Sequence, residues 1–330
     1  MRIAINGFGR IGKAVFKICL LRGINVVAIN DLHGVEDAQY MLKYDSIYGR
    51  FNGTIKAKKN ELIVNGKGIK VISESDPLNL PWAELKIDVV IEATGVFRER
   101  KEAMKHVASG AKRVLVTAPS DDADLTLVPG VNDSALKKDV KIISVASCTT
   151  NALAPVLKVL DEKFGIKESL MTTIHSYTSS QSLVDSSNKK RRRGRAAGLN
   201  MIPTTSGATD AVCLVLPKLT GKINGFAIRV PIANGSLVDL TAELKKIFTI
   251  KEINREFERQ SKGKLKGILG YTEDEIVSSD VIGTSESGII DALSTQKEGN
   301  LAKVLVWYDN EYGYSNRVVD VLSILKKWSK

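Results

Sequence analysis

The sequence predicts an α/β protein with two domains. The first is a doubly wound parallel sheet, and the second is an α+β domain whose sheet is largely antiparallel or mixed. Three observations support this prediction. The chain has 330 residues, which is enough for two hydrophobic cores. Up to about residue 147, apolar strand patterns alternate with helical patterns, as in parallel sheets. From residue 148 this regular alternation stops.

The first 31 residues contain the most informative pattern. A strand over residues 2–6 enters a glycine-rich turn, a helix follows over residues 11–22, and a second strand over residues 25–30 leads to Asp31. The glycines have the spacing G-x-G-x-x-G, and an acid follows about 20 residues later. This combination is typical of a Rossmann-type dinucleotide-binding domain.

Each residue of this pattern has a physical task. Gly7 permits a tight turn, Gly9 lets the backbone approach a pyrophosphate, and Gly12 lets the helix pack on the strand. The N–H groups at the helix N-terminus bind the pyrophosphate, and Asp31 binds a ribose hydroxyl pair. A purely structural turn would explain the glycines but not Asp31, so the sequence favours a dinucleotide site.

The rest of the first domain continues the alternation. Ligands bind at the carboxyl ends of parallel strands, and Thr94, Gly95 and Thr117 follow two predicted strands. The expected elements are helices over residues 35–43 and 99–109, a hairpin excursion within residues 49–72, and buried strands over residues 88–93, 113–117 and 140–146.

Cys148 stands between the predicted strand 140–146 and an apolar helical pattern over residues 152–160. At a helix N-terminus, free amides and the helix dipole favour a thiolate, which is the nucleophilic form of cysteine. The alternative is a small buried core cysteine, the commoner state of a lone cysteine. Cys19 and Cys213 fall in apolar helical patterns, and we expect both in the core.

The second domain is expected to span residues 148–314, after a first domain over residues 1–147. The amphipathic C-terminal helix, residues 315–330, is expected to pack back on the first domain. Strands are predicted over residues 168–175, 225–230, 236–241 and 303–308, and helices over residues 207–216, over residues 251–261 and from residue 317.

Composition narrows the class of protein. The hydrophobic and charged contents, 43% and 26%, are ordinary for a soluble globular protein, and no apolar run reaches the roughly 18 residues of a membrane span. The N-terminus has a short strand pattern in place of a secretory signal. The three cysteines lie far apart without metal-ligand spacing. We therefore expect no metal site, no disulfide and a reducing, cytoplasmic location.

The net charge is +11, and much of it lies in the basic run, which we define as residues 189–195. Three interpretations stay open: a solvated charged face, nucleic-acid binding and, as the family resemblance described below implies, contact with a partner subunit and with phosphate. The run lacks the interleaved aromatic residues of a single-strand platform, so nucleic-acid binding is not expected as the main role.

Beyond these patterns, the sequence resembles the phosphorylating glyceraldehyde-3-phosphate dehydrogenase family across essentially the whole chain. One matching stretch is Ser-Cys-Thr-Thr-Asn at residues 147–151. Each stretch is weak alone, and together they are highly specific. The matching stretches are residues 5–12, 30–31, 93–95, 146–151, 175–178, 202–207, 229–231 and 307–317.

The resemblance implies a role for each matching residue. Cys148 corresponds to the nucleophile and His175 to the base, which suits an imidazole because its intrinsic pKa lies near neutrality. Thr178, Arg229 and, more weakly, Ser180 correspond to the site for the substrate's phosphate. The inorganic phosphate site corresponds to Ser147, Thr149, Ser206 and Gly207, and the cofactor site to Gly7, Phe8, Gly9, Arg10, Ile11, Gly12, Asp31, Thr94, Gly95, Thr117, Asn310 and Tyr314.

The resemblance further implies NAD(P)-dependent oxidation of D-glyceraldehyde 3-phosphate with inorganic phosphate in glycolysis and gluconeogenesis, by a homotetramer. The alternatives are erythrose-4-phosphate dehydrogenase, and a nucleic-acid or partner-binding protein on the same fold. Of the other two histidines, His33 is expected in a turn and His106 on an exposed helix face.

Some positions depart from the family pattern. Ser186 and Ser187 replace the Leu-Pro pair of NAD-specific members, and a serine there occurs in members that accept NADP. Ser75 stands where many members have an arginine beside the adenosine. Asp31 is retained, however, and an acid repels the 2′-phosphate of NADP. We therefore expect NAD, with NADP or dual use as the alternative.

Overall fold

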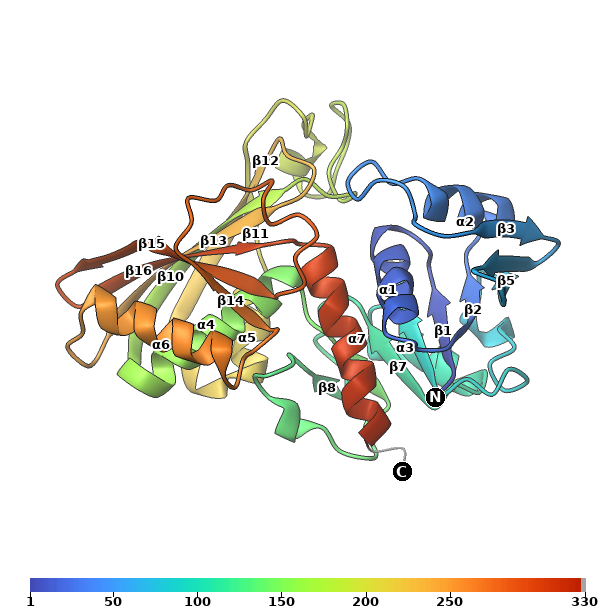
Figure 1. Ribbon diagram of the computed structural model, residues 1–330, viewed down its shortest axis with the longest axis horizontal. Helices are drawn as coiled ribbons and strands as arrows, with labels where there is room; N and C mark the ends of the chain where they lie inside the picture. Colours follow the sequence, from blue (N-terminus) through green and yellow to red (C-terminus); the bar gives the residue numbers. More distant parts are fainter. Residues whose placement is uncertain (328–330) are drawn as a thin grey trace. The chain divides into compact units, whose positions relative to one another are not determined.

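The computed structural model describes residues 1–327, which form two compact units. Unit 1 consists of residues 1–127, residues 133–146 and the chain from Val318 onward, and unit 2 consists of residues 128–132 and 147–317. The last three residues of the predicted C-terminal helix, 328–330, lie outside the described residues. Each unit is built around one sheet, and Figure 1 shows both sheets with their helices.

Most strands of the unit 1 sheet run in parallel, as the sequence predicts. The strands are β1 (Ile3–Asn6), β2 (Val26–Asn30), β3 (Ile55–Lys58), β4 (Glu61–Val64), β5 (Lys67–Ile72), β6 (Val89–Glu92), β7 (Arg113–Val116), β8 (Leu125–Thr126) and β9 (Ile142–Ser144). Their order is β3-β4-β5-β2-β1-β6-β7-β9-β8, and only β3 with β4 and β4 with β5 pair in antiparallel fashion. Since β5 pairs with β2, the predicted hairpin excursion is part of this sheet.

Three helices connect these strands close to their predicted positions. They are α1 (Arg10–Leu21), α2 (Gly34–Lys43) and α3 (Arg100–Ala108). The helix α1 packs on β1 and β2, and α3 packs on β7 and β9. The strands β1 and β6 are buried along their whole length, which explains their nearly continuous apolar sequence. The carboxyl ends of β1, β2 and β6 carry the residues predicted to bind a dinucleotide.

The sheet of unit 2 is mixed, which confirms the predicted class. Its strands are β10 (Ile166–Ser176), β11 (Ile202–Thr205), β12 (Ile223–Val230), β13 (Ser236–Leu244), β14 (Leu269–Thr272), β15 (Gly288–Glu298) and β16 (Leu301–Tyr308). Their order is β11-β12-β10-β13-β16-β15-β14, with parallel pairing between β10 and β12 and between β14 and β15. The strands β11, β14 and β15 were not predicted from the sequence.

The helices of unit 2 are α4 (Cys148–Phe164), α5 (Ala208–Val215) and α6 (Ile250–Lys262), and α4 packs on β10, β13, β15 and β16. The last helix, α7 (Tyr312–Lys327), starts five residues before its predicted start at residue 317. It starts there because Asp309 Oδ1 accepts hydrogen bonds from the N–H groups of Glu311 and Tyr312 (2.9 and 2.8 Å). Within residues 1–327, no helix combines the length and the apolar character that a membrane crossing requires.

Candidate active site

The glycine-rich turn between β1 and α1 has the geometry that its sequence requires. Gly7 adopts φ +90°, and a Cβ there would lie 2.7 Å from the backbone nitrogen of Thr94. A Cβ on Gly12 would collide with the carbonyl oxygen of Gly7. A Cβ on Gly9 would meet nothing within 4 Å, so this backbone faces open space. The turn therefore leaves room at the start of α1 for the pyrophosphate that the sequence predicts there.

Asp31 follows β2 and is held in a fixed orientation. Its Oδ2 accepts a hydrogen bond from the N–H of Phe8 (2.8 Å), and its Oδ1 accepts one from the N–H of His33 (3.1 Å). Both Asp31 and Gly9 line a crevice of about 390 Å³, together with Thr94 at the end of β6. An acceptor for ribose hydroxyls and an open glycine backbone thus share one crevice in unit 1, which fits a dinucleotide.

A buried polar network connects the strand ends behind this crevice. The carboxylate of Glu92 accepts hydrogen bonds from Asn6 Nδ2, and from the N–H and hydroxyl of Thr94. His106 Nε2 lies 3.1 Å from the same carboxylate, and His106 Nδ1 accepts from Trp82 Nε1 (2.9 Å). His106 is 0% exposed, so its predicted position on an exposed helix face is wrong. The face of α3 that carries it turns toward Trp82 and Glu92.

The other predicted cofactor residues of unit 1 differ in position. Thr117 donates its hydroxyl hydrogen bond to the carbonyl of Glu92 (3.0 Å), and Gly95 adopts φ +73° beside Thr94. The guanidinium of Arg10 pairs with Asp45 (2.8 Å) and lines a separate hollow. Arg10 and Ile11 therefore stay candidates only through their backbone N–H groups at the start of α1.

In unit 2, Cys148 lies next to His175. Cys148 is the first residue of α4, and the distance from its Sγ to His175 Nε2, near the end of β10, is 3.4 Å. His175 Nδ1 lies 2.7 Å from the carbonyl oxygen of Ser176, which can only accept a hydrogen bond. The proton of the neutral ring therefore sits on Nδ1, and Nε2 presents its lone pair to the thiol.

The start of α4 positions the cysteine. Ser147 caps the helix, with its Oγ accepting a hydrogen bond from the N–H of Thr150 (3.0 Å). The preceding Ala146 adopts φ +53°, which is uncommon for a residue with a side chain. This turn ends β9 and starts α4 within four residues, and such strained positions are concentrated at functional sites.

Burial and charge set the protonation of the pair. Burial raises the pKa of the Cys148 thiol, and the positive charge of Arg229 partly opposes this rise. Burial, strengthened by the charge of Arg229, lowers the pKa of His175 to about 3. Burial thus opposes the thiolate that a helix N-terminus favours. At neutral pH the site holds a thiol beside an imidazole that can accept its proton.

The predicted residues for the substrate's phosphate form one cluster. Arg229 Nη1 donates to the hydroxyl of Thr178 (3.2 Å), and that hydroxyl lies 2.8 Å from Ser180 Oγ. Arg193 Nη1 also donates to Ser180 Oγ (3.3 Å). The Nε of Arg229 is buried and has no hydrogen-bond partner in the described chain. Two guanidinium groups and two hydroxyl groups thus leave donor capacity for an anion.

The predicted residues for inorganic phosphate lie at the N-termini of two helices that pack together, α4 and α5. Ser147 occupies the N-cap position of α4, Thr149 lies in the first turn of that helix, and Gly207 occupies the N-cap position of α5. Ser206 Oγ accepts from the N–H of Ala208 (3.2 Å), and Thr149 Oγ1 lies 2.9 Å from Tyr308 OH. Both helix N-termini favour an anion.

Asn310 has a defined amide orientation. Its Oδ1 accepts hydrogen bonds from the hydroxyls of Ser176 (2.9 Å) and Ser236 (2.8 Å), so its Nδ2 remains the donor for a carboxamide oxygen. Tyr314 is buried on the first turn of α7, and burial raises its pKa well above the usual value. Both residues belong to unit 2.

Two residues of this site, Arg193 and Tyr308, were not predicted from the sequence. Arg193 was assigned only to the basic run, although it contacts Ser180, Thr204 and Thr205. Tyr308 bonds Thr149 and packs edge-on against the ring of His175. A signal for Arg193 existed in the excess of arginine over lysine at residues 191–195, because arginine is the preferred residue for bidentate phosphate binding.

The two cysteines predicted to lie in the core differ in their burial. Cys19 is fully buried, which confirms its prediction, and Cys213 is only half-buried. All three cysteines are free. Residues 1–327 contain no group of three or more His, Cys, Asp or Glu side chains that could hold a metal ion.

Comparisons with known proteins agree with this geometry. Residues 1–100 match the model of the glyceraldehyde 3-phosphate dehydrogenase NAD binding domain, and residues 147–310 match that of the C-terminal domain. The chain is 53% identical over 330 residues to glyceraldehyde-3-phosphate dehydrogenase of Thermotoga maritima, covering 99% of both chains. It is 52% identical over 327 residues to glyceraldehyde-3-phosphate dehydrogenase 1 of Bacillus cereus, covering 98% of both. The cofactor of the first domain is NAD, and the chain belongs to the glyceraldehyde-3-phosphate dehydrogenase family.

Proposed function

We propose that this chain oxidises D-glyceraldehyde 3-phosphate to 1,3-bisphosphoglycerate with NAD and inorganic phosphate, in glycolysis and gluconeogenesis. One observation carries the proposal. A thiol lies 3.4 Å from an unprotonated imidazole nitrogen, and Arg229 links this pair to an anion-binding cluster through its bonds to Ser176 and Thr178. A nucleophile, its base and a phosphate site are the groups that covalent oxidation of a phosphorylated aldehyde requires.

The first step is attack by Cys148 on the aldehyde. His175 Nε2 accepts the thiol proton, the sulfur forms a bond to the carbonyl carbon, and the imidazolium returns the proton to the resulting alkoxide. The product is a hemithioacetal on Cys148. Arg229 and Thr178 hold the substrate's phosphate, so that the carbonyl carbon meets the sulfur. The charge of Arg229 also favours the thiolate during attack.

The second step converts the hemithioacetal to a thioester. His175 accepts the hydroxyl proton again, and NAD, when bound, supplies the acceptor for the hydride. Asn310 would orient the carboxamide of the cofactor through Nδ2, since its Oδ1 is engaged by two serine hydroxyls. The turn Gly7–Gly12 and Asp31 would hold the pyrophosphate and the ribose.

The third step is attack of inorganic phosphate on the thioester. Ser147, Thr149, Ser206 and Gly207 would hold this anion at the N-termini of α4 and α5. The acyl phosphate forms as the carbon–sulfur bond breaks, and the leaving thiolate of Cys148 takes back a proton from the His175 imidazolium.

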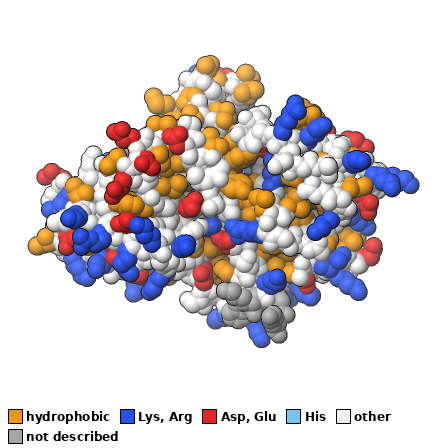
Figure 2. Space-filling view, in the orientation of Figure 1, with side chains coloured by type: hydrophobic (Ala, Val, Ile, Leu, Met, Phe, Trp, Pro, Cys, Tyr) orange, Lys and Arg blue, Asp and Glu red, His pale blue; other side chains and the backbone are white. Residues whose placement is uncertain are grey.

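Neither of the two alternative functions considered from the sequence is favoured. The relatives compared above carry the name of the triose phosphate enzyme over nearly their full length, and none is named for erythrose 4-phosphate. The basic run is partly engaged within the chain, since Lys190 donates to Thr205 (2.6 Å) and Arg195 pairs with Asp185 (2.8 Å). On the face drawn in Figure 2, lysine and arginine side chains are scattered, with acidic side chains among them. This distribution gives no support for nucleic-acid binding as the main role.

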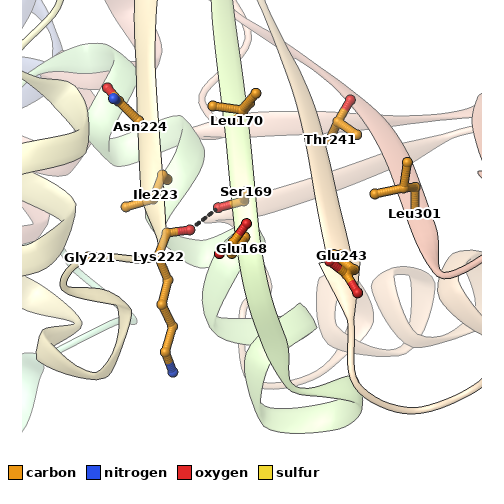
Figure 3. Close-up of a pocket in the computed structure, with 10 residues that line it drawn as sticks. All are labelled: Glu168, Ser169, Leu170, Gly221, Lys222, Ile223, Asn224, Thr241, Glu243 and Leu301. Carbon is orange, nitrogen blue, oxygen red and sulfur yellow. Dashed lines mark hydrogen bonds between the residues drawn. The ribbon is translucent and has the colours of Figure 1, made fainter.

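We further propose a homotetramer in the cytoplasm, as the family resemblance implies. Along β13, every second residue is buried and the intervening residues are half-buried, so one face of the sheet is less covered. Figure 3 shows a hollow on strands β10, β12, β13 and β16, lined by Leu170 and Leu301, which are 67% and 43% exposed. Contact with a second copy would bury these side chains. Three free cysteines are consistent with a reducing compartment.

Initial rates test the proposed function. The purified chain is assayed with D-glyceraldehyde 3-phosphate, phosphate and NAD, and with erythrose 4-phosphate as the competing aldehyde. We expect fast reduction of NAD that depends on phosphate and prefers the triose. Turnover with the tetrose alone, or no turnover with either aldehyde, would contradict the proposal. Light scattering after size-exclusion chromatography gives the number of chains per particle, and a monomer would overturn the tetramer.

A further inference from the structure

The NAD crevice contains an ionisable group without a role in the proposed function. His33 occupies the N-cap position of α2, and its side chain is 76% exposed. Its Nδ1 lies 3.0 Å from Asp31 Oδ1, the oxygen that also accepts the backbone N–H of His33. His33 and Asp31 both line the crevice. The residue that selects between ribose hydroxyls and a 2′-phosphate thus has an imidazole beside it.

Hydrogen-bond capacity fixes the arrangement of this pair. An ionised carboxylate only accepts hydrogen bonds, so the imidazole donates through Nδ1–H. Asp31 Oδ1 then accepts two hydrogen bonds from His33, and Oδ2 accepts one from Phe8. A carboxylate has about four acceptor positions, so roughly one is left for a ribose hydroxyl. His33 therefore takes up capacity with which Asp31 would otherwise bind the cofactor.

His33 also differs in its possible charge from the other residues that line the crevice. The described residues that line the crevice include two acids, Asp31 and Glu74, and no lysine or arginine. Two further acids, Glu36 and Asp37, stand in the first turn of α2. A 2′-phosphate carries a charge of about −1.5 to −2 at pH 7 and is normally accommodated by an arginine. Among these lining residues, His33 alone can carry a positive charge.

We propose that His33 is a pH-dependent determinant of cofactor choice in this protein. With a neutral imidazole, Asp31 repels the 2′-phosphate and NAD is strongly preferred. With a protonated imidazole, the charge of Asp31 is offset and a cation faces the 2′-position, so NADP is accepted more readily. Because a lower pH favours the protonated ring, relative use of NADP rises toward acidic pH. This inference rests on the proposed dehydrogenase function.

The test is the ratio of kcat/KM for NADP to kcat/KM for NAD, measured from pH 8.5 to pH 6.0. Titration of Cys148 and His175 affects both cofactors alike and cancels in the ratio. For the unaltered chain we expect the ratio to rise about fivefold toward pH 6, the size of one exposed charge pair. In His33→Asn the ratio should change only through protonation of the 2′-phosphate itself, which has a pKa near 6.

A permanently charged variant and a binding measurement complete the design. In His33→Lys, the ratio of kcat/KM for NADP to kcat/KM for NAD should be higher at pH 8 than in the unaltered chain. Like His33→Asn, this variant should lack the part of the pH dependence that comes from His33. Calorimetric titration of NADP and NAD into the unaltered chain and His33→Asn at pH 6 and pH 8 repeats the comparison without turnover. Equal pH dependence in the unaltered chain and His33→Asn would overturn the proposal. A chain that binds both cofactors but does not oxidise the triose would contradict the proposed function alone, because the titration still decides the role of His33.

Discussion

Two buried histidines in this protein have opposite surroundings. His106 in unit 1 is 0% exposed and lies between the carboxylate of Glu92 and the indole N–H of Trp82. His175 in unit 2 is 3% exposed, donates to a backbone carbonyl and directs its free lone pair at a thiol. The first ring is fully engaged by groups that never react. Burial alone therefore does not identify a catalytic histidine, and the chemistry of the partner at each nitrogen does.

The strongest test of this comparison removes the thiol partner. Cys148→Ala should lower kcat by about 10⁴-fold or more, because no covalent intermediate can form. Binding of NAD, measured by calorimetry, should persist, since the turn 7–12 and Asp31 belong to unit 1 and Cys148 belongs to unit 2. Cys213→Ala is a matched control because this half-buried cysteine of α5 directs its Sγ to the carbonyl of Leu219, and it should keep full activity. Substantial oxidation by Cys148→Ala would contradict the assigned nucleophile.

Removing the catalytic ring should have the next largest effect. His175→Asn should slow acylation about 10² to 10⁴-fold at pH 7, as expected for a lost general base. Its pKa of about 3 keeps the ring neutral above pH 5, so the unaltered chain should not lose its base between pH 5 and 8. The variant depends on thiolate, and burial raises the pKa of Cys148, so its rate should rise about tenfold per pH unit through this range. Single-turnover kinetics measure the acylation rate and its pH dependence. An unchanged rate and an unchanged pH dependence would count against His175 as the base.

Removing the charge beside the pair should have a smaller effect. Arg229→Leu should raise the pKa of Cys148 further, since the guanidinium opposes the effect of burial. Alkylation of Cys148 by iodoacetamide at pH 8 should slow about tenfold, with Cys148→Ala giving the background from the other cysteines. The KM for the triose phosphate should rise about 10- to 100-fold, because charge-assisted hydrogen bonds to the phosphate are lost. An unchanged KM would place the substrate's phosphate elsewhere.

The smallest expected effect on chemistry comes from the other histidine. His106→Ala should destabilise the fold by about 2–3 kcal/mol in urea unfolding, because Trp82 Nε1 and one oxygen of Glu92 lose buried partners. The KM for NAD should rise several-fold, since Glu92 also orients Thr94 and Asn6 in the crevice. Alkylation of Cys148 should keep its rate and pH profile, and His106→Gln should restore part of the affinity. A slowed alkylation would remove the contrast between the two histidines.

Several features of the fold could not be predicted from local sequence patterns. The strand β11 contains Pro203 and lies at the sheet edge, where proline is tolerated. A register shift between Asp291 and Gln296 interrupts the alternation along β15, so no period of two was visible. The start of α7 depends on the carboxylate of Asp309 as a cap, which the apolar periodicity from residue 317 does not indicate.

Some of the site residues could likewise be predicted from local sequence patterns, and others could not. The turn 7–12 and Asp31 are separated by one strand–helix–strand unit, so chain connectivity brings them together as predicted. His106 reaches Glu92 and Trp82 only after α3 packs on the sheet, and its helical pattern beside Lys105 suggested solvent. Arg193 contacts Ser180 and Thr204 only through the path of a long loop.

Local sequence patterns were sufficient to predict the glycine turn, the parallel sheet of unit 1, and a cysteine at the junction of β9 and α4. These follow from backbone freedom, hydrophobic period and helix capping, which act over a few residues. The protonation of Cys148 and His175, in contrast, depends on the packed fold. Desolvation raises the pKa of the Cys148 thiol and lowers that of His175. The charge of Arg229, 81 residues away from Cys148 in the chain (229 − 148 = 81), partly opposes the rise for Cys148 and adds to the fall for His175. Burial and through-space charge depend on what packs around a group, and no short stretch of sequence contains that information.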